Sequence, residues 1–157
     1  FSKNSMVNSN DRSFFWRLSV EENLKFFSSL SNKESTEKIK ETLILLDIFD
    51  KIDFPFMSLS YGERKKISIA RALLNDSKIL LLDEITNSLD INAKKIVIST
   101  LKGLLKKNHL QLIIFATHSL DEVIRLSNRF LFIKDKAIFI DQKVNENTLV
   151  TDIENKF

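Results

Sequence analysis

Hydrophobic and polar positions along this chain fall into two patterns, one typical of helices and one typical of strands. Ile39, Leu43 and Leu46 recur at intervals of four and three residues, which places them on one face of a predicted helix. Two largely apolar runs, Lys78–Asp83 and Leu110–Ala116, predict strands that are buried on both faces. Because buried strands alternate with helices, the pattern indicates an α/β fold with a mostly parallel sheet.

Three Ser-x-x-Glu sequences mark predicted helix starts. In such a capping box the serine hydroxyl accepts from the backbone N–H three residues on, and the glutamate carboxylate accepts from the serine N–H. We expect capping boxes at Ser19–Glu22, Ser60–Glu63 and Ser119–Glu122, each opening a helix. A further helix is expected over Asn92–Lys107.

Shorter segments complete the predicted organisation. Met6-Val7 predicts a short strand within an otherwise irregular start, and Arg129–Lys134 with Ala137–Asp141 predicts a β-hairpin. The tail from Val144 is polar and weakly helical. The predicted fold is therefore α/β, with a mostly parallel sheet, flanking helices, an α-helical part and a C-terminal β-hairpin.

Composition favours one globular domain and argues against several other classes. At 157 residues, 43% of them hydrophobic, the chain is long and apolar enough for a packed core. It has no apolar run of membrane-spanning length and no signal-peptide pattern, and the lack of cysteine excludes disulfides and cysteine metal sites. The net charge is +3, and the basic residues are spread along the predicted helices beside acidic ones and do not form a cluster. Nucleic-acid binding is therefore not expected.

An acid pair, Asp83-Glu84, ends the first apolar run. Ligands of open α/β sheets bind at the carboxyl ends of the strands, which is where this pair falls. The Asp83 carboxylate would suit Mg²⁺, a cation that prefers oxygen ligands, and Glu84 would act as general base toward an attacking water. The alternative interpretation is a strand that simply leaves the core through charged residues.

Three other positions carry candidate phosphate chemistry. The helix predicted to start at Ser60 would offer free N–H groups and a positive dipole end to an anion, with Gly62 keeping the backbone approachable. His118, just after the second apolar run, would contact a terminal phosphate. Each has an ordinary alternative: a plain capping box, a structural histidine and, for Asp90, an acid that merely starts a helix.

Taken together, the order and spacing of these positions resemble the ATP-binding cassette (ABC) ATPases. Ser60 precedes Asp83 by 23 positions, Asp83 precedes Asp90 by 7, and Glu84 precedes His118 by 34. The segments look like the signature motif, Walker B, D-loop and H-loop of that family. The resemblance extends from about Met6 to Asp141.

The resemblance implies a role for each candidate residue. Ser60, Gly62 and Glu63 would form the signature motif, which grips the γ-phosphate of an ATP held by a partner domain. Asp83 is similar to the magnesium-associated acid and Glu84 to the catalytic base. The remaining counterparts are a switch histidine (His118), the D-loop (Ser88, Leu89 and Asp90) and the Q-loop glutamine position (Asn10).

The implied protein is the C-terminal portion of an ABC transporter ATP-binding subunit that hydrolyses ATP with Mg²⁺. It would form a head-to-tail dimer with a second nucleotide-binding domain and contact a transmembrane permease on the cytoplasmic face of the membrane. A helical subdomain would span about residues 10–75, the second half of the catalytic core about 76–141, and a polar tail 142–157. The stretch Asp11–Leu18 looks most like exporters of the ABC-2 type, and its aromatic residues either meet the permease or pack locally.

Several residues depart from the family pattern. The chain begins with Phe1 and contains no GxxxxGK[ST] P-loop, so the Walker A lysine is expected to precede Phe1. Without that loop the chain alone is expected to be inactive. Tyr61 replaces a glycine, Glu63 replaces the common glutamine, Ile85 replaces a proline and Asn10 replaces glutamine, which leaves catalysis by this signature open.

Two alternatives stand beside this interpretation. One is a non-transport ABC-family ATPase, either an SMC-like chromosome protein or a translation factor, although no coiled-coil heptads are present. The other is a non-catalytic remnant or interaction module. The missing P-loop and the low glycine count, two in the whole chain, favour it.

Overall fold

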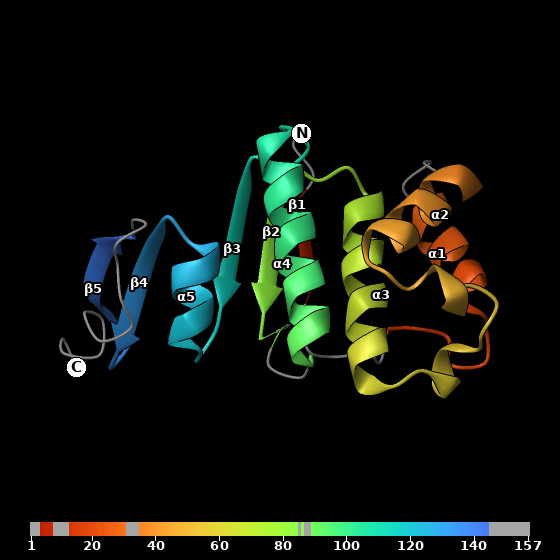
Figure 1. Ribbon diagram of the computed structural model, residues 1–157, viewed down its shortest axis with the longest axis horizontal. Helices are drawn as coiled ribbons and strands as arrows, with labels where there is room; N and C mark the ends of the chain where they lie inside the picture. The colour runs from red at the N-terminus through yellow and green to blue at the C-terminus, as the bar shows by residue number, and fades with distance from the viewer. Residues whose placement is uncertain (1–3, 8–12, 31–34, 85, 87–88, 145–157) are drawn as a thin grey trace. The chain divides into compact units, whose positions relative to one another are not determined.

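The computed structural model describes residues 4–7, 13–30, 35–84, 86 and 89–144, so Asn10, Ile85 and Ser88 lie outside the described residues. The chain divides into two compact units, Phe1–Ala116 and Thr117–Phe157. Figure 1 labels their helices and strands. The first unit contains β1 (Asn4–Val7), α1 (Val20–Ser29), α2 (Thr36–Leu45), the 3₁₀ turns η1 (Phe49–Lys51) and η2 (Phe56–Ser58), α3 (Tyr61–Leu74), β2 (Ile79–Asp83), α4 (Ile91–Lys106) and β3 (Leu112–Ala116). The second contains α5 (Leu120–Leu126), β4 (Arg129–Lys134) and β5 (Ala137–Lys143). Within the described part of the chain, no helix combines the length and the apolar character that crossing a membrane requires.

The first unit is built on a parallel three-stranded sheet in the order β1-β2-β3. Met6 pairs with Leu81, which pairs with Ile114, and both strand pairings are parallel. The predicted strand at Met6-Val7 and both longer predicted strands are therefore confirmed. Because the strands are parallel, their carboxyl ends share one edge of the sheet, and the end of β2 lies there beside the end of β3.

Burial of this sheet differs between its two faces. Val7, Leu80 and Leu82 point into the hydrophobic core, which they share with apolar residues of α3 and α4. On the opposite face, Leu112 and Ile114 of β3 are 45% and 53% exposed. The prediction that both strands are buried on both faces is thus wrong: on this face β3 is exposed, and Ile79 and Leu81 of β2 are only half-buried. A continuous apolar run shows that both faces of a strand carry apolar side chains. It does not show whether both faces are covered, and the described helices of this unit cover only one.

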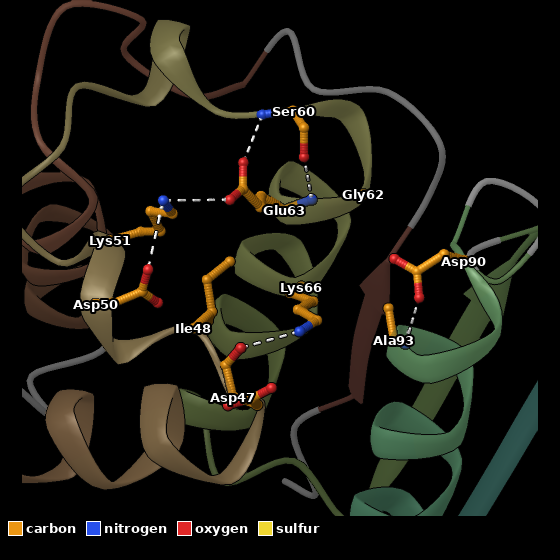
Figure 2. A pocket seen from close by; sticks show the side chains of 10 residues that line it. All are labelled: Asp47, Ile48, Asp50, Lys51, Ser60, Gly62, Glu63, Lys66, Asp90 and Ala93. Carbon is orange, nitrogen blue, oxygen red and sulfur yellow. Dashed lines mark hydrogen bonds and ion pairs between the residues drawn. The ribbon is translucent and has the colours of Figure 1, made fainter.

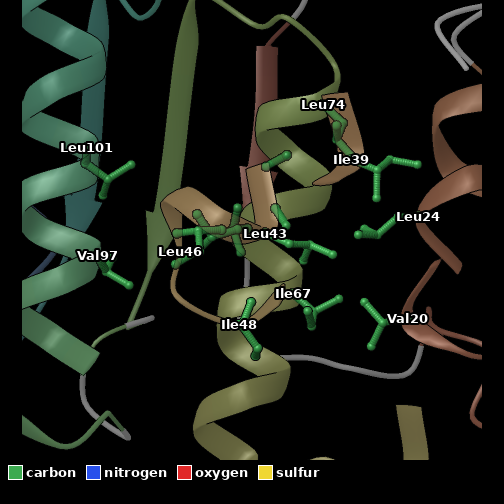
Figure 3. Packing of buried hydrophobic residues seen from close by; sticks show 14 of the residues in the cluster. Val20, Leu24, Ile39, Leu43, Leu46, Ile48, Ile67, Leu74, Val97 and Leu101 are labelled. Atoms are coloured by element: carbon green, nitrogen blue, oxygen red, sulfur yellow. The ribbon is translucent and has the colours of Figure 1, made fainter. Parts of the chain in front are cut away.

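The helical part of the first unit packs around a buried apolar cluster (Figure 3). Ile39, Leu43 and Leu46 are fully buried, which confirms the predicted helix face. They meet residues of α1 and α3 such as Leu24 and Ile67, which are fully buried as well. The start of α3 is therefore held by a packed three-helix arrangement.

Two of the three predicted capping boxes are confirmed. At α1 the Ser19 hydroxyl accepts from Glu22 N–H at 3.1 Å, and Ser19 N–H donates to the Glu22 carboxylate at 2.7 Å. The same pair of bonds joins Ser60 and Glu63 at the start of α3, at 3.3 and 2.7 Å. The two helices therefore begin where the sequence places them.

The first capping box predicts a measurable titration. The N–H and hydroxyl of Ser19 hold the pKa of Glu22 below its ordinary value. A lowered folded-state pKa means that this carboxylate stabilises the fold above its unfolded pKa, and the contribution is lost as pH falls through the folded value. We expect Ser19→Ala to raise the pKa of Glu22 part of the way, because the hydroxyl bond is lost and the backbone bond stays. NMR titration of the Glu22 carboxyl group checks this, and an unchanged pKa would show that the hydroxyl contributes nothing.

The second unit pairs α5 with a β-hairpin. β4 and β5 are antiparallel, with Leu131 opposite Asp141, which confirms the predicted hairpin. The turn residues Asp135 and Lys136 have φ of 50° and 64°, the left-handed values that a two-residue type I′ hairpin turn requires.

The third predicted capping box, at Ser119, is wrong. Ser119 is the N-cap of α5, but its side chain makes no capping hydrogen bond. The Glu122 carboxylate accepts instead from the Thr117 hydroxyl, two residues before the cap.

Candidate functional site

The start of α3 presents backbone donors to its surroundings. Ser60 is extended, and its hydroxyl and N–H are both engaged with Glu63. The N–H groups of Tyr61 and Gly62, at the first two helical positions, meet no acceptor within the described part of the structure. Such groups, together with the positive end of the helix dipole, attract an anion. The Tyr61 side chain is exposed beside them, with the Lys65 ammonium 4.6 Å from its ring centroid.

A recess of about 380 Å³ lies at this helix start (Figure 2). It brings Ser60, Gly62 and Glu63 together with Asp90, which follows β2 in the chain. Four predicted site residues therefore share one recess, whereas Asp83 and Glu84 do not line it. The other lining residues are Asp47, Ile48, Asp50, Lys51, Lys66 and Ala93.

Two lysines in the recess were not singled out from the sequence. Lys51 Nζ lies 3.7 Å from a Glu63 carboxylate oxygen and 3.4 Å from Asp50. Lys66 Nζ donates to the Asp47 carbonyl at 2.9 Å, and Lys66 is buried. They supply positive charge beside the four acids of the recess, Asp47, Asp50, Glu63 and Asp90. No motif marks Lys51, because η1 reaches the start of α3 only through tertiary packing, and Lys66 lies on α3 outside the signature segment.

Asp90 is the N-cap of α4. One oxygen of its carboxylate accepts from Asn92 N–H and Ala93 N–H, both at 2.9 Å. The ordinary interpretation, an acid that starts a helix, therefore describes its hydrogen bonds. Its place in the recess is an additional property that the sequence alone did not fix.

The acid pair lies at the carboxyl end of β2, as expected. Asp83 is exposed and pairs in register with Ala116 of β3, while Glu84 N–H donates to the Ala116 carbonyl at 3.1 Å. Glu84 has φ of 50°, a left-handed conformation that is uncommon for a residue with a Cβ. Strained backbone of this kind concentrates at functional sites, and no local sequence pattern predicts it at Glu84.

The described part of this sheet edge offers few protein ligands for Mg²⁺. Among the described residues, no group of three or more His, Cys, Asp or Glu side chains is placed to hold a metal ion. Mg²⁺ typically binds proteins through one or two carboxylates and completes its shell with phosphate oxygens and water. The exposed carboxylate of Asp83 supplies one such ligand at this edge.

His118 follows β3 by two residues and belongs to the second unit, where its side chain is exposed. Thr117 and Ser119, on either side of it, are joined by a hydrogen bond from Ser119 N–H to the Thr117 hydroxyl at 3.0 Å. The histidine therefore lies in a short turn between β3 and α5.

An aromatic cluster flanks the helical part. Phe14 is buried and stacks on Phe56 with ring centroids 4.3 Å apart, so it packs locally. Phe15 and Trp16 are each 44% exposed, and the Arg64 guanidinium lies 4.6 Å from the Trp16 ring centroid. Local packing thus accounts for Phe14 and leaves Phe15 and Trp16 partly on the surface.

Comparison with known proteins gives the following matches. The model of the ABC transporter family matches residues 1–87. The aliphatic sulfonates import ATP-binding protein SsuB of Bacillus thuringiensis subsp. konkukian is 37% identical over 149 residues, which are 94% of this chain and 57% of that protein. The methionine import ATP-binding protein MetN of Ligilactobacillus salivarius is 37% identical over 119 residues, 76% of this chain and 33% of that protein. The chain thus spans between a third and just over half of these relatives.

Solved structures match the fold. The cbiO1 protein of Clostridium perfringens, part of the ABC transporter complex cbiONQ, superposes with a TM-score of 0.76 at 21% identity, over 98% of this chain and 60% of that one. A dimeric ATP-binding cassette in a post-hydrolysis state with ADP and Pi gives a TM-score of 0.78 at 19% identity, over 90% of this chain and 64% of that one.

Proposed function

Because this chain belongs to the ABC transporter family, we propose that it forms part of an ATP-binding subunit that powers transport through a membrane-spanning partner. The recess at the start of α3 carries this proposal, since it joins Ser60, Gly62 and Glu63 to Asp90 in one place. Free N–H groups at a helix start and two lysines suit the terminal phosphate of a nucleotide.

The proposed reaction is attack of water on the γ-phosphate of ATP. Mg²⁺, carried by the nucleotide, would neutralise developing charge on the phosphate oxygens. Asp83 would hold that ion from the end of β2, and Glu84 would orient the attacking water and take its proton. His118 would contact the γ-phosphate, and Asn10 would take the Q-loop position. Such catalysis depends on positioning, which parallel strands with a shared edge provide.

The phosphates also need a cradle, and the printed sequence contains no P-loop. We therefore propose that the recess acts on an ATP whose β- and γ-phosphates are held by the P-loop of another domain, in a head-to-tail pair. The lysines Lys51 and Lys66 would offset part of the acid in the recess when the phosphate enters.

The proposed partners are a transmembrane permease and a second nucleotide-binding domain, with the subunit on the cytoplasmic face of the membrane. The partly exposed rings of Phe15 and Trp16 are proposed as part of the permease contact. Residues 10–75 would be the helical subdomain, 76–141 the second half of the core and 142–157 a polar tail. The direction of transport is proposed as export, from the likeness of Asp11–Leu18 to exporters of the ABC-2 type. SsuB and MetN are named as import proteins, so they do not support that direction.

One observation favours a second candidate, a non-catalytic interaction module. Tyr61 occupies a position where the family has glycine, and its side chain is exposed at the helix start. A bulky ring there obstructs close approach of a phosphate to the Gly62 N–H. Measurable ATP turnover by a protein that carries this signature would exclude the module.

The Ser60 hydroxyl provides the test of the proposed recess. Ser60→Ala is expected to reduce ATP turnover about 10- to 100-fold, the effect of losing one hydrogen bond to a charged phosphate in a closed site. Turnover is measured in a fusion protein in which the P-loop-bearing segment of an ABC relative precedes Phe1.

Ser19→Ala is the matched control, because it also removes the serine of a capping box. Both variants are expected to lose similar stability, about 1 kcal/mol for an N-cap serine. Only Ser60→Ala should lower turnover, and an equal loss in both variants would reduce the role of Ser60 to helix capping.

A further inference from the structure

Two hydrogen bonds of Thr117 flank His118 in the turn between β3 and α5, one to Ser119 and one to Glu122 of α5. We propose that Thr117 and Glu122 are positioning residues, which hold this turn so that the His118 imidazole is presented in one direction. The inference rests on the proposed function only for the contact of the His118 imidazole with phosphate. The hydrogen bonds of the turn are properties of the structure itself.

A single hydroxyl group makes both bonds of the turn. Thr117 Oγ1 donates to a Glu122 carboxylate oxygen at 2.7 Å and accepts from Ser119 N–H at 3.0 Å. A hydroxyl that donates to a carboxylate is polarised and becomes a better acceptor for the second donor. The two bonds therefore strengthen each other.

Burial makes the first of these bonds strong. Glu122 is only 1% exposed, although it is an acid on a seven-residue surface helix. A hydrogen bond to a carboxylate is about twice as strong as one between neutral groups, and a low dielectric raises it further. The Thr117 hydroxyl is thus fixed at the side of α5, because Glu122 lies in the first turn of that helix.

The geometry acts on His118 through its two neighbours. Thr117 is tied to α5, and Ser119 is tied to Thr117 and begins the helix through a bond from Val123 N–H to the Ser119 carbonyl at 3.2 Å. The residue between two anchored neighbours has little backbone freedom. The turn thereby sets the direction of the Cα–Cβ bond from which the exposed imidazole extends, and a misplacement of about 1 Å at a catalytic group reduces rates roughly 100-fold.

A purely structural role for Glu122 makes a different prediction. If Glu122 served only to start α5, it would bond to the Ser119 N–H, as the sequence pattern predicts. In the structure that N–H reaches Thr117 instead, and the Ser119 side chain makes no capping bond. Loss of a helix cap would lower the stability of the unit without a specific effect on His118.

The test uses the 157-residue chain labelled at histidine and compares Thr117→Val with Thr117→Ser. Valine keeps the shape of threonine and lacks the hydroxyl, whereas serine keeps the hydroxyl. The chain has two histidines, so His109 is an internal reference in the first unit. In Thr117→Val we expect amide exchange of Ser119 to rise about three- to tenfold, the effect of one hydrogen bond, and the ring signals of His118 to shift and sharpen.

Thr117→Ser and the His109 signals should stay as in the unaltered chain. Ring signals of His118 that are the same in Thr117→Val as in the unaltered chain would overturn the proposal, whatever happens to stability. The signals of the β4–β5 hairpin report whether the unit is folded.

A second variant keeps the test decisive if the loss of the Thr117 hydroxyl in Thr117→Val unfolds the unit. Thr117→Val combined with Glu122→Met replaces both partners by apolar groups of similar shape, which is nearly neutral for stability. We expect the hairpin signals to be retained and the His118 and Ser119 changes to persist. A double variant with unchanged His118 signals contradicts the proposal.

Turnover of the fusion protein separates this inference from the proposed function. If His118→Ala leaves turnover unchanged while Thr117→Val moves the His118 signals, the proposed role of His118 fails and the positioning stands. If His118→Ala lowers turnover at least tenfold while Thr117→Val changes neither turnover nor the ring signals, the positioning fails and the proposed function stands.

Discussion

Glu84→Gln is expected to lower ATP turnover about 100- to 10,000-fold, the range that a general base contributes. Glutamine has the shape of glutamate and accepts hydrogen bonds, but it cannot take a proton from water at neutral pH. Both side chains have a Cβ, so the left-handed backbone at this position, with φ of 50°, is disturbed little by the exchange. Nucleotide binding should therefore persist while turnover is lost.

The measurement is phosphate release and nucleotide binding by the fusion protein that places a P-loop before Phe1. Glu41→Gln is the control, since it makes the same chemical change at an exposed position of α2. Retained turnover in Glu84→Gln would remove Glu84 from the reaction. A loss of both binding and turnover would indicate misfolding at the end of β2 and not a missing base.

The second large effect is expected on stability. Phe56 is fully buried, stacks on Phe14 and meets the Trp16 ring edge-on with centroids 6.0 Å apart. Phe56→Ala is expected to lower the free energy of unfolding by about 3–5 kcal/mol, because it removes a large apolar ring and leaves a cavity. The helical part that holds the start of α3 loses most from this change.

Urea unfolding of the 157-residue chain checks this result through the fluorescence of Trp16, which is the sole tryptophan. Met57→Ala is the matched control, because its side chain is adjacent in sequence and 57% exposed. The control should change stability by less than about 0.5 kcal/mol. A loss of under about 1 kcal/mol in Phe56→Ala would show that the site collapses around the missing ring and that the aromatic stack contributes little.

Local patterns were sufficient for most of the elements. The face of α2 and the capping boxes at Ser19 and Ser60 depend on contacts within one or two helical turns, which the sequence states directly. The box at Ser119 failed because Thr117 offered the same carboxylate another partner. The apolar run of β3 could not reveal that helices cover only one face of its sheet.

Parts of the candidate site have local sequence signals, and other parts depend on tertiary packing. The end of β2 and the helix start at Ser60 were predictable, because strand ends and helix starts have sequence signals. The approach of Lys51 to Glu63 joins segments whose contact arises only from packing of the helical part. The left-handed backbone of Glu84 runs against local preference, and such exceptions are expected at functional sites, where local rules yield to function.

The most direct measurement asks whether the recess acts on an ATP held by another domain. A P-loop-bearing ABC subunit whose own signature serine is substituted would be mixed with this chain, and ATP turnover would be followed. We expect that the unaltered chain restores turnover and that its Ser60→Ala variant restores about tenfold less. Equal restoration by both, or none by either, would contradict a recess that grips the phosphate in trans.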